Sequence, residues 1–238
     1  MTTGETTPRL INWIGYLTLT LLVALPLAVL TVRGGAWEQG LMLYAISCLG
    51  AALLLLLAAV LMLLPKFRPW RSAIAKRALF AVPGTVLLLS LLGGGNYPPI
   101  HDITTDTADP PRFVAAPKQR GENSNSLDIV AETLKAQQEA YSDLDTLVTD
   151  ASIENAFAQA KATAQALGWE IFHEDLNAGI IEATDTTAIM GFKDDIVIRL
   201  RTNERGTLVD LRSVSRVGVS DLGANAARIR EFLDAFKR

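Results

Sequence analysis

Three long apolar runs fill the first 95 residues of this 238-residue chain and stop at the triplet Gly93-Gly94-Gly95. Residues 10–32 and 41–64 hold no charged side chain, and each reaches the roughly 20 residues that a helix needs to cross a bilayer. Residues 78–92 form a shorter run that reaches this length only with the glycines included. We therefore expect three transmembrane helices at about 10–32, 41–64 and 78–95. A re-entrant or interfacial segment is the alternative for the third.

The charges between the runs predict the orientation of the helices. The connection 65–77 carries five basic side chains, from Lys66 to Arg77, and no acidic one. Short loops rich in Lys and Arg stay in the cytoplasm. The N-terminus is then cytoplasmic as well, and the third helix delivers residues 96–238 to the outer side. The prediction is a multi-pass protein of the cell inner membrane with a periplasmic C-terminal domain.

Net charge changes sign at the same place along the chain. Of 22 basic and 25 acidic residues, 7 and 2 lie before residue 96, which leaves 15 and 23 after it. Phosphate backbones bind basic surfaces, so nucleic acid is excluded as the main partner of this acidic half. No Asp, Glu, Lys, Arg or His side chain lies within the three runs, which argues against a pump or transporter. The expected partners are the lipid bilayer and either an envelope protein or a small anionic ligand.

Residues 96–126 are expected to form an extended arm, because five prolines between Pro98 and Pro117 interrupt regular structure. Helical spacing follows at 127–141 and 153–167, and a last helix is predicted to begin at Ser220. Strand-like runs occupy 169–173, 180–186, 196–201 and 208–216. Their short turns predict an antiparallel four-stranded sheet with helices packed on one face. The fold class is therefore three membrane helices plus an α+β domain over residues 127–238.

Arginines of the last two predicted strands form the main candidate site. Arg199 and Arg201 share one side of their strand, and Arg212 and Arg216 share one side of the next. Because arginine binds carboxylates and phosphates in bidentate fashion, and a helix start at Ser220 adds backbone donors, one hypothesis is an anion site. The alternative is an internal ion-pair network, in which Arg212 and Arg216 contact the nearby carboxylates Asp185, Asp194, Asp195 or Asp210.

His101 and Asp102 are a second candidate, as an acid–base pair or as metal ligands. No second histidine stands at a motif-like spacing, and Asp and Thr beside prolines commonly form turns and caps. Asp194 and Asp195 are neighbours, so in a strand they would point to opposite faces and would not cooperate. The sequence holds no nucleophile elbow, P-loop or dinucleotide-binding motif. We predict no metal site and no cofactor.

Short segments of the polar half carry a resemblance to a known family. They are Ile100–Asp106, Pro110–Phe113, Gly168–Trp169, Ile181–Thr186, Gly191–Asp195, Arg212–Gly218 and Ser220–Asn225, spread across residues 97–236. Together they resemble a bacterial and chloroplast family known as domain of unknown function 1499. The resemblance implies an extracytoplasmic or lumenal domain. It implies no activity and no catalytic residues.

From these patterns we expect a membrane-anchored periplasmic module that binds a ligand or a partner and is not an enzyme. The residues expected to bind are Arg199, Arg201, Arg212, Arg216, Ser220, His101 and Asp102. One alternative is an envelope hydrolase or metal-dependent enzyme that uses the His101–Asp102 segment and the arginine-lined face. Another is a structural subunit of a larger membrane complex.

Overall fold

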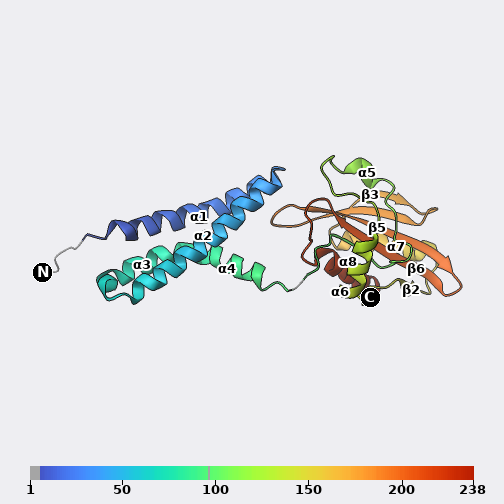
Figure 1. Cartoon of the computed structure of the whole chain (residues 1–238). Helices are drawn as coiled ribbons and strands as arrows, with labels where there is room; N and C mark the ends of the chain where they lie inside the picture. Colours follow the sequence, from blue (N-terminus) through green and yellow to red (C-terminus); the bar gives the residue numbers. More distant parts are fainter. Residues whose placement is uncertain (1–5, 96) are drawn as a thin grey trace. The chain divides into compact units, whose positions relative to one another are not determined.

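The computed structural model describes residues 6–95 and 97–238, and the chain divides into two compact units at Gly95 (Figure 1). Each unit is described by itself. The helices of the first unit are α1 (Arg9–Arg33), α2 (Trp37–Leu63), η1 (Pro65–Trp70), α3 (Arg71–Ala78), η2 (Leu79–Ala81) and α4 (Val82–Leu92).

Three helical stretches of the first unit are long and apolar enough to cross a membrane, namely α1, α2 and Pro65–Leu92. The third stretch begins earlier than predicted, because the basic connection is itself helical and runs through η1, α3 and η2 into α4. Pro65 occupies the first position of η1, where proline costs no hydrogen bond, and Arg and Lys are good helix formers. The three stretches fit a membrane protein.

Small side chains bring these helices close together. A Cβ added at Gly84 of α4 would lie 2.8 Å from the Cβ of Ala51 in α2. Such close approach matters in lipid, where helices associate through packing and not through a hydrophobic drive. A second set of buried residues joins α1, α2 and α3, and consists of Ile11, Ile14, Ala58, Leu61, Ile74 and Ala78.

The second unit is built around one antiparallel sheet. Its elements are β1 (Asp102–Thr104), α5 (Ala116–Gln119), α6 (Ala131–Ala140), β2 (Leu147–Thr149), α7 (Ile153–Ala166), β3 (Glu170–Asp175), β4 (Ile180–Thr186), β5 (Lys193–Asn203), β6 (Gly206–Ser215) and α8 (Ala224–Phe236). The sheet has six strands, so the prediction of four is wrong. The meander β3-β4-β5-β6 was predicted, but β1 and β2 also pair with the free edge of β6. Strands of three residues are too short to produce a visible alternation in sequence.

The start of α8 also differs from the prediction. The helix begins at Ala224 and not at Ser220, whose hydroxyl donates to the Pro98 carbonyl 3.3 Å away. The Asp221 carboxylate accepts the amides of Gly223 at 2.9 Å and Asn225 at 2.8 Å. Asp221 therefore caps the helix, because its carboxylate accepts amides at the helix start that have no partner within the helix.

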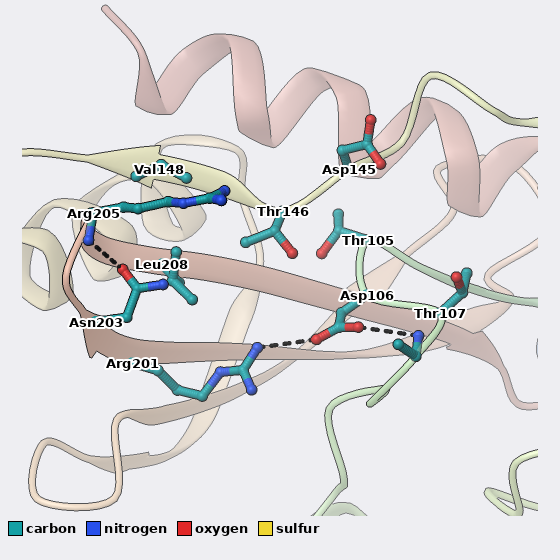
Figure 2. Close-up of a pocket in the computed structure, with 11 residues that line it drawn as sticks. Thr105, Asp106, Thr107, Asp145, Thr146, Val148, Arg201, Asn203, Arg205 and Leu208 are labelled. Atoms are coloured by element: carbon teal, nitrogen blue, oxygen red, sulfur yellow. Dashed lines mark hydrogen bonds and ion pairs between the residues drawn. The ribbon is translucent and has the colours of Figure 1, made fainter.

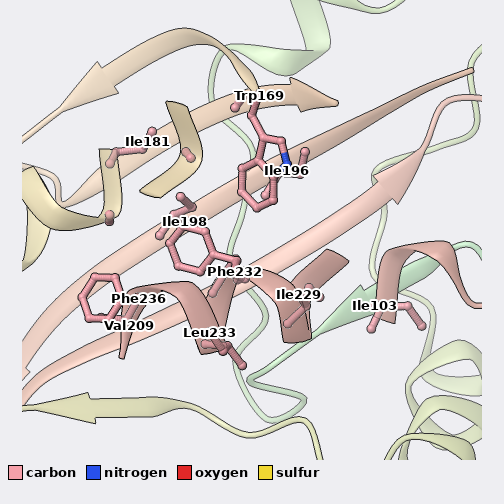
Figure 3. Close-up of a cluster of buried hydrophobic side chains, with 14 of the residues drawn as sticks. Ile103, Trp169, Ile181, Ile196, Ile198, Val209, Ile229, Phe232, Leu233 and Phe236 are labelled. Atoms are coloured by element: carbon pink, nitrogen blue, oxygen red, sulfur yellow. The ribbon is translucent and has the colours of Figure 1, made fainter. Parts of the chain in front are cut away.

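One face of the sheet carries the hydrophobic core. Helix α7 packs over β3 and β5, and α8 packs over β6 and β1. Phe232 of α8 is fully buried and stacks on Trp169 with ring centres 5.4 Å apart (Figure 3). Ile196 and Ile198 of β5 point to these helices, as their alternation predicted.

Within the arm, residues 97–126, β1 extends the sheet and Ile100 and Ile103 join the core, while the part after β1 covers the opposite face of the sheet. In Figure 1, α5 lies above β3 and β5, and α8 lies below these two strands. The arm contributes β1 and α5 and hydrogen-bonds to β4, β5 and β6 through the contacts described below. The extended, proline-rich segment expected from sequence is thus a packed third layer, since charged side chains of the sheet need the partners that it brings.

Candidate functional site

Charged side chains occupy the sheet face that the arm covers. They alternate with core residues along β4, β5 and β6, and we call them the charged sheet face: Glu182, Asp195, Arg199, Arg201, Asp210, Arg212 and Arg216. Three of the carboxylates are fully buried, and Arg212 is 2% exposed. Because a buried charge costs several kcal/mol unless it is paired, each of these groups must have partners.

Arg212 is held by the arm. Its guanidinium binds Asp102 in bidentate fashion, with Nε–Oδ1 at 2.9 Å and Nη2–Oδ2 at 2.7 Å. Further N–H groups donate to the carbonyls of Pro111 at 3.3 Å and Leu127 at 2.9 Å. The Phe113 ring lies 5.5 Å from the guanidinium carbon. These contacts occupy most of the donors of Arg212, so the side chain fastens β1 and the arm to β6.

Asp195 is the centre of a second group of contacts. Arg216 donates to it from Nη2 at 2.7 Å and from Nε at 3.0 Å, and Arg120 of the arm donates from Nη1 at 2.9 Å. The Thr184 hydroxyl adds a bond at 3.0 Å. Burial lowers the pKa of Arg120, and the charge of Asp195 opposes that effect. A single buried carboxylate thus joins two arginines that lie far apart in sequence.

Arg199 and Arg201 share three aspartates. Both arginines reach Asp106 at 3.0 Å, and they reach Asp210 at 3.2 and 2.8 Å. Asp109 accepts from Arg199 at 3.0 Å and from Arg201 at 3.3 Å. The two arginines lie on β5, Asp210 lies on β6, and the other aspartates belong to the arm. The ion pairs therefore tie the arm to two neighbouring strands.

Glu182 fixes the arm at α5. Its buried carboxylate accepts the backbone amides of Val114, Ala115 and Ala116, the last two at 3.0 and 2.7 Å. These amides lie at the start of α5, where a helix leaves its N–H groups without internal partners. The carboxylate therefore satisfies its own charge with backbone donors and holds the arm over β4.

The core side of the sheet has its own buried charges, among which sequence reasoning missed Arg228. Asp185 and Asp194, expected as possible partners of Arg212 and Arg216, pair with Arg228 instead. Arg228 of α8 reaches Asp185 at 2.8 Å and Asp194 at 2.6 Å, and it also bonds to Ser213 and Asn225. Its position in the sequence could have indicated burial, because Asn225 and Arg228 stand three residues apart on the same helix face as the apolar Ile229. Asp194 and Asp195 do point to opposite faces of the sheet, as their adjacency predicted.

The structure does not gather the predicted site residues into one pocket. Asp102 contacts Arg212, whereas the Nδ1 of His101 lies 3.4 Å from the Val219 carbonyl, so these two neighbours serve different partners. Arg212 borders a small cleft of about 170 Å³ with its donors already engaged. Within residues 6–95 and 97–238, no three His, Cys, Asp or Glu side chains lie so that they could hold a metal ion.

One predicted residue, Arg201, lines an open cleft of about 430 Å³ (Figure 2). The cleft lies beside the edge of β6, between β2, whose pairing with β6 ends at Val209, and β1, whose pairing with β6 starts at Arg212. Its lining residues are Thr105, Asp106, Thr107, Ala108, Asp145, Thr146, Val148, Arg201, Asn203, Arg205 and Leu208. Hydroxyl, amide and charged side chains therefore make up most of the lining, beside Ala108, Val148 and Leu208.

Asp106 stands in the wall of this cleft and has an altered acidity. Burial pushes its pKa up, but bonds from the Asp109 amide, the Arg201 side chain and the Ala108 amide outweigh that effect. The pKa of Asp106 is therefore lowered from its ordinary value of 3.8. The folded state stabilises the ionised carboxylate, so Asp106 acts as a structural anion at neutral pH.

We predict that Arg212→Ala lowers the free energy of unfolding by about 3–5 kcal/mol, because it leaves the largely buried Asp102 carboxylate without its cation. Chemical denaturation of the purified full-length protein in detergent measures this loss. The neighbouring Arg112 is exposed and provides the control, since Arg112→Ala should change stability little. Equal stability of the two variants would contradict a structural role for Arg212.

We predict that Asp106→Asn destabilises the domain by about 1–3 kcal/mol at pH 7, through loss of charge-assisted hydrogen bonds. A lowered carboxyl pKa contributes stability that is present above the ordinary value and is lost as pH falls through the lowered value. The difference between wild type and variant should therefore shrink below about pH 4. Asp145→Asn, in the exposed wall of the same cleft, should show neither effect. Denaturation curves at pH 7 and pH 3 test both variants.

Comparison with known proteins places this architecture in a family. Residues 102–236, which make up more than half of the chain, match the family described as a protein of unknown function (DUF1499). Among curated proteins, none matches the chain significantly. The matched segment begins at the first residue of β1 and ends with α8, so it contains the six strands, the charged sheet face and the cleft. On this evidence the chain belongs to the DUF1499 family.

Proposed function

We propose that this chain is a binding module anchored in a bacterial inner membrane, with its second unit exposed in the periplasm. Three apolar helices support the anchor. Support for the orientation comes from the basic residues, which gather at one end of the helices. Arg77 donates to the Asn12 side chain at 2.8 Å, so the basic stretch 65–77 lies beside the start of α1 at Arg9. Basic helix ends remain on the cytoplasmic side.

The cleft in Figure 2 is the observation that carries the binding proposal. The arginines of the charged sheet face form internal ion pairs, so few of their N–H donors remain for an external anion. In the cleft, Arg201 and Arg205 are matched by Asp106 and Asp145. The two positive and two negative side chains offset one another, so the cleft has no excess charge to attract an anion.

The ligand that fits such a cleft is uncharged and rich in hydroxyl groups, as a carbohydrate is. The Thr105 and Thr146 hydroxyls donate to Asp210 and keep oxygen lone pairs that can accept from a ligand. Thr107, which accepts from Gln138, keeps its proton to donate, the Asn203 side chain keeps its NH₂ group, and Leu208 supplies an apolar surface for C–H groups. From sequence, an anion site and an internal ion-pair network were both open for these arginines, and their pairing with aspartates supports the network. Because His101 and Asp102 serve separate partners, the arrangement supports binding over catalysis.

The orientation predicts the behaviour of a fused reporter. An alkaline phosphatase joined after Arg238 should be active in intact cells, because that enzyme folds only where its disulfides form. A fluorescent protein that requires the cytoplasm should be dark at the same position. The opposite pattern would place the second unit in the cytoplasm. Fusion after residue 70 serves as the matched control and should reverse both signals.

Ligand binding is tested through Arg205, whose exposed side chain lines the cleft. Neutral oligosaccharides should raise the melting temperature of the full-length protein in detergent, whereas inorganic phosphate should not. Arg205→Ala should weaken binding about tenfold, which corresponds to loss of about 1.4 kcal/mol. Lys135→Ala removes an exposed positive charge from α6 and should leave binding unchanged. Stabilisation by phosphate alone would favour an anion site instead.

A further inference from the structure

Three connecting segments of the second unit leave the sheet at the same end. The loop 187–192 joins β4 to β5, whose ends pair through Thr186 and Lys193. The loop 216–223 follows β6, where Ser215 pairs with Asp194 in the same part of β5. The start of the domain, residues 97–101, precedes β1, where Asp102 pairs with Val214. Strand register alone therefore brings the three segments to one end of the sheet.

Large apolar side chains are exposed in all three segments. Val219 is 76% exposed, Leu222 60%, Ile189 70% and Tyr97 43%. Exposed apolar groups gathered at one end of a domain mark an interaction surface. An open groove of about 360 Å³ begins at Tyr97, and it is lined by Tyr97, Pro98, Pro99, Ala136, Glu139 and Ala140.

The apolar side chains are held in place and do not belong to a loose loop. The Asp221 amide donates to the Ile100 carbonyl at 3.1 Å, which ties the loop 216–223 to the start of the domain. Gly223 lies against Tyr97, where an added Cβ would come 2.6 Å from the ring. Leu222 has a φ of 53°, a left-handed conformation that is costly for a leucine. The chain thus accepts backbone strain while it exposes a large apolar side chain.

The length of the connection to the first unit identifies what covers this surface. Tyr97 follows Gly95 by two residues, so their Cα atoms can be at most about 7.6 Å apart, at 3.8 Å per step. Gly95 itself stands three residues after the end of α4 at Leu92. The whole connection from Leu92 to Tyr97 is five steps, at most about 19 Å, and the polar headgroup zone of a bilayer is about 5–8 Å deep on each side, so Tyr97 stays near the bilayer surface. Tyrosine is also enriched at that depth.

Net charge decides how the contact is made. The second unit carries 15 basic and 23 acidic residues, so anionic headgroups repel it. Glu139 and Asp221 add negative charge close to the apolar surface. Net charge therefore disfavours a contact based on basic residues, and insertion of apolar side chains into the interface is the mode that the exposed residues favour.

We propose that Tyr97, Ile189, Val219 and Leu222 dock the second unit onto the bilayer that holds its own helices. This docking rests on the proposed membrane anchoring. It holds on zwitterionic lipid and persists at high salt, because it depends on apolar burial. It also fixes the side of the second unit that faces the bilayer, and so limits how the cleft beside β6 can be oriented in the periplasm.

Site-directed fluorescence in proteoliposomes tests the docking. The full-length protein with Cys48→Ala receives one new cysteine, Val219→Cys, labelled with an environment-sensitive dye and placed in phosphatidylcholine vesicles that contain a lipid-borne quencher. The matched control is Leu176→Cys, which is 45% exposed in the β3–β4 turn at the opposite end of the sheet. Quenching at position 219 should be several-fold stronger than at 176, and high salt should not reduce it.

A third cysteine separates the docking from the anchoring. Leu56 of α2 is exposed and lies within an apolar span, so Leu56→Cys should be quenched strongly. Strong quenching at 56 with equal weak quenching at 219 and 176 would overturn the docking and leave the anchoring intact. Absence of quenching at 56 would overturn the anchoring itself. Loss of quenching at 219 in high salt would overturn apolar insertion as the mode of contact.

Discussion

Pairing of buried charges is the constraint on which the second unit depends. Glu182, Asp195 and Asp210 are fully buried on one face of the sheet, and water cannot reach them to offset the cost of burial. The nearest cations and amides come from the arm and from neighbouring strands. Without the arm, three carboxylates and several arginines would lose partners together. The sheet and the arm must therefore fold as one structure.

This pairing also decides what the domain can bind. An arginine with its donors engaged by Asp102 or Asp195 has no strong site left for an external anion. The open cleft lies at the margin of the network, where Arg201 is shared with Asp106 and where Arg205 extends into solvent. The network thereby gives the cleft a rigid wall, since Arg201 and Asp106 hold one another in position. Pre-organised walls reduce the ordering cost of ligand binding.

Much of the fold was predictable because it rests on local patterns. The predicted strand 180–186 has the bounds of β4, and the alternation in β5 correctly assigned the Ile196 and Ile198 side chains to the core face. The additional strands escaped prediction because three residues show no periodicity, and their pairing to β6 is made over more than 50 residues of chain. The start of α8 was missed because Ser220 and Asp221 both have side chains suited to capping. Which of the two side chains caps the helix depended on a tertiary contact, since the Ser220 hydroxyl bonds to the Pro98 carbonyl.

The sequence by itself determined the division at Gly95, the apolar helices, the charge of each half and the membership of the DUF1499 family. These properties depend on composition and on neighbours along the chain, which a sequence contains directly. Only the tertiary structure decided that Arg212 pairs with Asp102, that Glu182 holds α5, and that Arg201 borders a cleft. Alternating arginines on a strand give the same sequence pattern whether their side chains face solvent or pair with carboxylates. The partner that settles the matter lies about a hundred residues away, and only folding brings it within hydrogen-bonding distance.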